Sequence, residues 1–334
     1  MSLIAQPHAS NLLATSIGSS LAAGGGYVDI VREGVLAGFV TYTRASSGTY
    51  YDSAGVLQTA LTNIQRKTYD PITLALRGLM IEEARTNLVL NAATLVTQSV
   101  TVAAVAHTLS FHGTGTVTLS GVSTAGPLVG TGATNRVTLT FTPTAGSLTL
   151  TVTGTCTLAQ LEAGALVTSY IPTTSAAVTR AADSGICADL SLLSYDQTKG
   201  TIYIEGVGPA GQTCDWVQLN NSTINEGVFL YSAAGINGIS VYRDGGVSQA
   251  TLSPALTVGT PWKFATAFAA NDFASCVNGG AVSTDVSGTL GTPTRFVIGA
   301  ACSAYASGIK VVTIKNLRYY PRRLTNAELQ ALTA

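Results

Sequence analysis

The sequence predicts an all-β protein with two antiparallel β-sandwiches, preceded by an extended N-terminal arm and a small hairpin-rich module and followed by one short helix. Apolar residues alternate with Thr and Ser at period two over long stretches, which is typical of strands with one buried face. Turn signals rich in Gly, Pro, Asn and Asp separate these runs at short intervals, as in sandwich domains. The signals that begin a helix are clear only near the C-terminus.

The composition argues against several classes of partner. Charged residues make up 10% of the 334 residues, against about 25% in ordinary globular proteins. The 17 basic and 17 acidic residues cancel, so no broad field attracts nucleic acid or an anionic membrane. No window approaches the ~20 apolar residues of a membrane span, and the N-terminus shows no export-signal pattern. We therefore expect synthesis in the cytoplasm, no nucleic-acid partner and no membrane span.

The first ninety residues divide into two parts. Residues 1–30 are rich in Ala, Ser, Gly and Leu, with Gly24 to Gly26 as a flexible joint, so we expect an arm that a partner holds. Residues 31–90 carry turn chemistry at Asp52 and at Asp70-Pro71, which predicts a hairpin-rich module.

The adjacent acids Glu82 and Glu83 raise the question of acid/base chemistry. Neighbouring residues on a strand point to opposite faces, so these carboxylates are not expected to share a catalytic site. The better interpretation is an ion pair between Arg85 and one of them.

Residues 91–178 give the clearest β signal. The inward positions of the expected strands share one parity in each run: Leu109, Phe111, Val117, Leu119, Val137, Leu139, Phe141, Leu148, Leu150 and Val152. Threonine on the other parity favours the strand without adding charge. His107 and His112 lie five apart on a strand and hence on opposite faces, so they make a poor metal or catalytic pair.

Residues 179–334 repeat this pattern with different sequence. Asn278-Gly279 predicts a hairpin with a type I′ turn. Residues 325–332 predict a helix, in which Thr325 is the N-cap, Glu328 completes a capping box, and Leu324 and Leu329 form a hydrophobic staple. We expect this helix to close the end of a sheet.

The five cysteines have no metal-ligand spacing and are odd in number. We interpret Cys156, Cys187, Cys214, Cys276 and Cys302 as small apolar residues. A disulfide between Cys276 and Cys302 is kept as an alternative.

Four segments together resemble a family of tailed-phage virion proteins: YTRASSGTYYDSAGVLQ (42–58), LRGLMIEEARTNLVLN (76–91), AQLEAGALVTSYIPTTSAAVTRAAD (159–183) and IKNLRYYPRRLTNAELQAL (314–332). Members of that family look like tail fibres, tail-associated adhesins, head fibres and decoration proteins. The resemblance implies a jelly-roll similar to carbohydrate-binding modules in the middle, and a second one similar to concanavalin and laminin-G domains at the C-terminus. It also implies a location in the virion, reached after lysis of the bacterial host.

The resemblance covers most of the chain from about residue 40 onward, and residues 1–30 carry none of it. Together with the composition and turn signals, it divides the chain into 1–30, 31–90, 91–178 and 179–334, with residues 160–183 as an inter-domain joint. Pro172 makes Ile171 extended and stiffens the crossing. Tyr170 and Ile171 are expected to pack into the seam, and Arg180 and Asp183 to fix the start of the next domain. The alternative is a plain linker, which differs in rigidity.

No catalytic, cofactor-binding or metal-ligating residues are predicted. The sequence lacks the nucleophile-elbow, zincin and phosphate-loop motifs, its acids are few and many of them adjoin turns, and no calcium-type carboxylate cluster is evident.

A glycan site would instead need aromatic faces and polar groups that read hydroxyls. The candidates in the C-terminal domain are Trp216, Tyr231, Tyr242, Arg243, Asn271 and Asp272. Most of them also have a structural alternative; Trp216 and Tyr231, for example, would fit a core or a subunit contact equally well.

The sequence and the resemblance together leave two candidate functions. The leading one is a structural protein of a tailed-phage virion, attached to other virion proteins through residues 1–90 and presenting its sandwiches for adhesion to host-surface carbohydrate. The alternative is a capsid decoration, head-fibre or structural tail protein without a receptor-binding role. A homo-oligomer is expected in both. The resemblance suggests a trimer, and because no heptad repeat is present, it would form through β-domain faces and the N-terminal segment.

Overall fold

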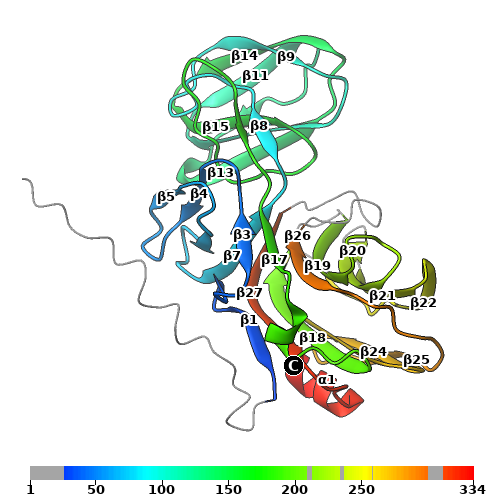
Figure 1. Ribbon diagram of the computed structural model, residues 1–334. Coiled ribbons are helices and arrows are strands. Elements are labelled where there is room, and N and C mark those ends of the chain that lie inside the picture. Colours follow the sequence, from blue (N-terminus) through cyan, green and yellow to red (C-terminus); the bar gives the residue numbers. More distant parts are fainter. Residues whose placement is uncertain (1–25, 209–212, 234–236, 258, 300–310) are drawn as a thin grey trace, which may run out of the picture.

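The computed structural model describes residues 26–208, 213–233, 237–257, 259–299 and 311–334. It consists almost entirely of antiparallel sheets with one α-helix, which confirms the predicted all-β class. Figure 1 shows two sandwiches, the middle one at the top of the view and the C-terminal one below it. In the described part of the chain, no helix has the length and apolar character needed to cross a membrane.

The C-terminal sandwich consists of two large sheets. The first has nine strands: β2 (Val35–Leu36), β1 (Val28–Arg32), β27 (Val311–Tyr320), β18 (Lys199–Val207), β23 (Trp262–Ala269), β24 (Asp272–Val277) and β25 (Ser283–Asp285) in this order, with β7 (Leu76–Glu82) on β27 and β6 (Lys67–Tyr69) on β7. The second has seven strands in the order β22 (Val247–Leu252), β21 (Asn237–Asp244), β20 (Gly227–Ala233), β19 (Cys214–Asn220), β26 (Arg295–Gly299), β17 (Ser184–Cys187) and β3 (Thr41–Thr43).

Strands from the N-terminal ninety residues are built into both of these sheets. One edge of β27 pairs with β18 along its length, and the other edge pairs with β1 near Leu317 and with β7 near Ile314. In the second sheet, β3 pairs with β17. Residues 31–90, treated above as a separate module, therefore share sheets with the last domain. β1 also begins at Val28, inside the range expected to be an arm. Residues 1–25 lie outside the described residues.

The core of this sandwich lies between the two sheets. Trp216 on β19 and Trp262 on β23 stack with ring centroids 4.2 Å apart, and Phe264 meets the edge of Trp216 at 5.7 Å. All three side chains are buried. Such aromatic pairs contribute roughly 0.5–1.5 kcal/mol beyond the area they bury, so they join the sheets firmly.

The middle sandwich keeps the predicted inward parity, but the strand at His107–Gly113 is buried on both faces, so Thr108 and Ser110, expected on a wet face, are buried as well. Its sheets are β13 (Gly132–Phe141), β10 (His107–Gly113) and β15 (Cys156–Ala163) on one side, and β12 (Leu128–Val129), β11 (Thr116–Gly121), β14 (Gly146–Thr153) and β9 (Gln98–Val102) on the other. Leu109, Phe111, Val117 and Leu150 are fully buried between them. Two small sheets complete the fold: the hairpin β4 (Gly48–Tyr51) with β5 (Leu57–Ala60), and β8 (Arg85–Asn87) with β16 (Val178–Arg180).

The short helices lie in the C-terminal domain. A 3-10 turn spans Leu190–Leu193. Helix α1 (Asn326–Thr333) has the predicted capping box of Thr325 and Glu328, and Leu324 and Leu329 share one apolar cluster. That cluster includes Ala265 on β23 and Ala274 on β24, so α1 covers the outer face of the nine-stranded sheet. The small side chains on that face leave room for the helix. Its last turn also meets the turn that ends β24, where Thr333 Oγ1 accepts from the Gly279 N–H and Gln330 Nε2 donates to the Gly280 carbonyl, so α1 covers an outer face as well as an end of the sheet.

The structure also tests the predictions made for the cysteines and for the acids Glu82 and Glu83. Cys156, Cys187, Cys214 and Cys276 are buried free thiols, and Cys302 lies outside the described residues. Arg85 pairs with Glu83, while Glu82 on the opposite face is fully buried. The positions of Glu82 and Glu83 agree with the predicted strand geometry, in which neighbouring residues point to opposite faces.

Candidate functional site

A network of buried charges lies where the two sandwiches meet. It contains three arginines and two acids, each at most 1% exposed: Arg44, Arg66, Arg180, Glu82 and Asp183. Arg66 Nη2 lies 2.8 Å from Glu82 Oε2 and 2.5 Å from Asp183 Oδ2. Arg44 Nη1 reaches Asp183 Oδ1 at 3.2 Å, and Arg180 Nη1 reaches Glu82 Oε2 at 3.0 Å. Buried charges are tolerated when they are paired and hydrogen-bonded in this way.

Hydrogen bonds extend the network into the middle sandwich. Ser169 donates its backbone N–H and its hydroxyl to the two oxygens of Glu82, at 2.7 and 2.6 Å. Arg180 Nη1 also donates to Thr168 Oγ1 at 3.1 Å, and Thr168 binds Glu162 on β15 through its backbone N–H and hydroxyl. Because Glu82 ends β7 and Glu162 lies in β15, this chain of contacts links a strand of each sandwich.

The charges of the network shift the pKa of Glu82. Burial alone would raise the pKa of this carboxyl, but Arg180, Arg66 and the hydrogen bonds from Ser169 outweigh burial and lower the pKa to about 2. The carboxylate is therefore ionised at neutral pH and acts as an anchor rather than as a proton donor. Beside it, burial and Asp183 raise the pKa of the Tyr42 hydroxyl, which donates to Asp183 Oδ1 at 2.6 Å.

The remaining predicted joint residues lie around this network. Tyr170 and Ile171 are buried and Pro172 is exposed. The Ile171 N–H donates to Gln160 Oε1 at 2.7 Å, and its carbonyl accepts from Asn87 Nδ2 at 2.8 Å. The joint is thus packed and hydrogen-bonded around Tyr170 and Ile171, whereas residues 174–179 are exposed.

Two of the glycan-site candidates are corrected by the structure. Trp216 is fully buried against Trp262, and Tyr242 is 1% exposed, with its hydroxyl bonded to Thr266 inside the core. Neither ring can present a face to a ligand in this fold, because both point toward the opposing sheet. Periodicity could not decide this, since a ligand-binding aromatic and a core aromatic have the same spacing.

The other four candidates lie apart from one another or in turns. Tyr231 is half-buried in β20, and Arg243 donates to the Gly246 carbonyl in the β21–β22 turn. Asn271 has φ of 58° and exchanges hydrogen bonds with Gly288, and Asp272 pairs with Arg323 at 2.7 Å. The structure does not gather the six candidates into one site.

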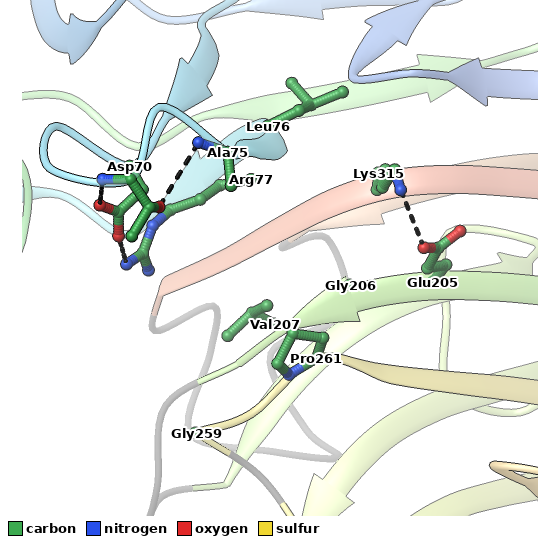
Figure 2. Close-up of a pocket in the computed structure, with 11 residues that line it drawn as sticks. Asp70, Ala75, Leu76, Arg77, Glu205, Gly206, Val207, Gly259, Pro261 and Lys315 are labelled. Carbon is green, nitrogen blue, oxygen red and sulfur yellow. Dashed lines mark hydrogen bonds and ion pairs between the residues drawn. The ribbon is translucent and has the colours of Figure 1, made fainter. Parts of the chain in front are cut away.

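A groove that the sequence did not indicate crosses the outer face of the nine-stranded sheet (Figure 2). One cavity of about 310 Å³ is lined by residues of the β6–β7 turn and of β18 and β27, including Asp70, Arg77, Glu205 and Lys315. A second cavity of about 380 Å³ continues from it, because both share Arg77, Val207 and Gly259. The residues that line the groove are far apart in sequence, and although Asp70, Arg77 and Lys315 lie in segments singled out above, nothing in the sequence indicated that they meet.

The acids in this groove are already occupied. Asp70 accepts from the backbone N–H groups of Thr73 and Ile72 and from Arg77, and these bonds lower the pKa of its carboxyl. Glu205 accepts from Asn316 at 2.7 Å and lies 3.4 Å from Lys315 Nζ. Neither acid is arranged for proton transfer. Among the described residues, no three His, Cys, Asp or Glu side chains gather as metal ligands.

Comparisons with known proteins add little to this geometry. No protein-family model and no curated protein sequence matches the chain. One similar solved structure is the CBM40 module of the Ruminococcus gnavus IT-sialidase bound to α2,3-sialyllactose, with 15% identity and a TM-score of 0.36 over 41% of this chain and 84% of that one. Another is the binding domain of botulinum neurotoxin serotype D/C, with 8% identity and a TM-score of 0.36 over 45% of this chain and only 40% of the toxin chain. At these TM-scores the similarity carries no weight for function.

Proposed function

We propose that this chain is a non-catalytic structural protein of a tailed-phage particle that holds two β-sandwiches as one stiff unit. The observation that carries the proposal is the buried network at the joint. Arg66 lies just before β6, Glu82 ends β7, and Arg180 and Asp183 belong to the joint, and all four are buried and paired. Moving one sandwich relative to the other would expose or unpair these charges, which costs several kcal/mol. A spacer in an assembly needs such stiffness.

The composition supports a place within an assembly. The chain has no net charge and few charged residues, and its surface carries exposed apolar side chains such as Leu61, Ile72 and Val286. The sequence motifs between residues 42 and 332 supply the resemblance to phage proteins. Residues 1–90 are the part proposed to attach to other virion proteins.

Imaging of particles tests this function. We expect antibodies raised against the chain to decorate intact virions at one defined position in electron micrographs. Particles assembled with a chain that lacks residues 1–25 should lose the decoration, whereas the purified truncated protein should keep the β-sheet circular dichroism of the full chain. Virions that never carry the chain would contradict the proposal.

Adhesion to carbohydrate is a second candidate function, and the groove favours it. The groove offers polar groups from Asp70, Arg77, Glu205 and Lys315 beside the apolar side chains of Val207 and Pro261. Polar groups set in an apolar wall are the usual means of binding a small polar ligand. Binding of the purified full chain to host cells, and its loss after enzymatic removal of surface glycans, would test this use.

A further inference from the structure

The groove has an excess of hydrogen-bond donors. The Asp70 carboxylate is held by its own turn and by Arg77, and the Glu205 carboxylate by Asn316 and Lys315. The cations retain unused donors, because a guanidinium has five N–H groups and an ammonium three. The side chains of Arg77 and Lys315 are 47% and 37% exposed. A ligand in this groove therefore meets donors more than acceptors.

A buried hydroxyl extends this set of donors into the second cavity. Thr313 on β27 lines that cavity and is 7% exposed, and its Oγ1 has no hydrogen-bond partner in the part of the chain that the structure describes. A buried polar group without a partner costs about 1–3 kcal/mol. Thr313 Oγ1 is itself closed to solvent, so a rotation of the side chain about χ1 toward the cavity would bring it to a ligand atom, and the bond would recover that energy.

The walls of the second cavity are apolar. Leu166 and Val167 follow β15 of the middle sandwich, while Val207 and Val311 come from β18 and β27. Arg77 stands between this cavity and the first one. The site thus combines an apolar enclosure, a guanidinium at its border and a hydroxyl in its lining.

The pairing of the strands disfavours an extended peptide as the ligand. Peptides that bind to sheets add a strand at a free edge. Here β27 is paired on one side with β18 and on the other with β7, β18 is also paired with β23, and β7 with β6. β18 and β27, which form the floor of the groove, are each paired on both edges, so side chains must do the binding.

We propose that this groove binds an acidic saccharide, whose carboxylate is held by Arg77 and the Thr313 hydroxyl and whose ring hydroxyls face Lys315, Glu205 and Asp70. A guanidinium is well suited to a carboxylate, which it can bind through two parallel hydrogen bonds. The mixed donors and acceptors of the first cavity match hydroxyl groups, which both donate and accept. The proposal rests on the adhesive function and specifies its site and its ligand class.

The test is binding of the full chain to saccharides that carry a carboxylate, each compared with its own methyl ester. Saturation-transfer NMR and titration calorimetry would be run on a panel of hexuronate and nonulosonate oligosaccharides. We expect at least one acid to bind, and its ester, which has nearly the same shape but no charge, to bind at least tenfold more weakly. Equal binding of acid and ester, or equal binding of poly-glutamate, would overturn the proposed ligand.

Three variants locate the site. Arg77→Gln and Thr313→Val should each weaken binding of the acid at least tenfold, and Thr313→Val keeps the shape of the side chain. Lys199→Gln is the matched control for Arg77→Gln, since Lys199 is likewise a half-exposed cation in an ion pair, with Asp196, and does not line the groove. Thermal unfolding monitored by circular dichroism confirms that each variant is folded.

The outcomes separate the site from the function. If the chain binds saccharides and Arg77→Gln changes nothing, adhesion stands and the groove is not its site. If no saccharide on the panel binds and the chain does not bind host cells, both the groove and the adhesive function fail. Binding of the chain to host cells without binding of any acidic saccharide overturns the ligand class alone.

Discussion

Glu82 and Glu83 show how strongly the environment decides the role of a residue. The two acids are neighbours in sequence, and the strand turns them to opposite faces. Glu82 is fully buried among Arg66, Arg180 and Ser169, whereas Glu83 lies near the surface and pairs with Arg85. The same side chain is thus a structural anchor at one position and part of a partly solvated pair at the next.

Replacing Glu82 and Glu83 one at a time tests how much the buried charge network at the joint contributes to stability. Glu82→Gln leaves two buried arginines without a full counter-charge, so we expect a loss of about 3–5 kcal/mol in the free energy of unfolding. Glu83→Gln is the matched control and should cost about 1 kcal/mol or less. Denaturant titration followed by circular dichroism measures both. Equal effects would show that the buried network does not stabilise the joint.

The lowered pKa of Glu82 also predicts a response to acid. Its pKa is about 2 in the folded chain, below the ordinary value of 4.5. A group with a lowered pKa contributes stability that is present above its unfolded pKa and is lost as the pH falls toward its folded pKa. The wild type should therefore lose stability between about pH 4.5 and pH 2 more steeply than Glu82→Gln. If the stability of the two proteins fell equally between pH 4.5 and pH 2, the lowered pKa of Glu82 would be contradicted.

The pKa of Asp215 is shifted in the opposite direction. It is buried in β19, and burial raises the pKa of its carboxyl to about 6. The folded state then disfavours the ionised form, so the contribution of this group to stability is present below its ordinary pKa of 3.8 and is lost as the pH rises toward 6. We expect Asp215→Asn to raise the free energy of unfolding at pH 7 by about 1–3 kcal/mol, and to have little effect at pH 3.5. A loss of stability at pH 7 would show that the carboxylate has a favourable partner.

At the scale of the element, the turn between β24 and β25 depends on backbone geometry. Asn278 and Gly279 have φ of 47° and 67°, and the Gly280 N–H donates to the Val277 carbonyl at 2.8 Å. These values fit the predicted type I′ turn. The Asn278 side chain also accepts from the Lys263 N–H at 2.8 Å, so the turn is tied to the neighbouring strand β23.

Two substitutions separate the turn geometry from that hydrogen bond. Asn278→Gly loses the side-chain bond but keeps the left-handed backbone, whereas Asn278→Ala loses both the bond and the tolerance of positive φ. We expect the alanine variant to be about 1–2 kcal/mol less stable than the glycine variant. Thermal unfolding of the two proteins measures the difference. Equal stability would mean that the turn relaxes to another conformation.

At the scale of the whole molecule, the last domain depends on strands from the start of the chain. β1, β2, β6 and β7 belong to its first sheet, and β3 and β17 extend its second sheet beyond β26. A fragment that begins at residue 190 would lack all six and expose the edges of β26 and β27. Exposed edges promote aggregation.

Expression of two fragments tests this dependence. We expect residues 190–334 to be insoluble or unfolded, and residues 26–334 to be soluble and to unfold cooperatively. Size-exclusion chromatography and circular dichroism distinguish the two results. A soluble, folded 190–334 fragment would show that the N-terminal strands are dispensable for this sandwich.

The sequence by itself determined the local elements of this protein. The alternation through Leu109 and Phe111, the turn at Asn278 and the cap of α1 are set by residues close together in the chain, where steric preference and side-chain direction act directly. The all-β class follows from the same short-range rules. The joint at residues 160–183 could also be recognised from the sequence, because Pro172 and Arg180 interrupt the alternation of apolar and polar residues found on either side.

Tertiary structure decided which of these elements meet. β7 and β27 are more than two hundred residues apart, and nothing in either strand specifies the other as its partner, so the shared sheets of the first and last domains could not be predicted. Burial of Trp216 and Tyr242, rather than exposure, depends on which face of each strand meets the opposing sheet. The groove between Arg77, Val207 and Thr313 exists only once three strands and a loop of the middle sandwich are packed together. Packing joins residues through space, and a periodic pattern in one segment carries no information about the surface that will cover it.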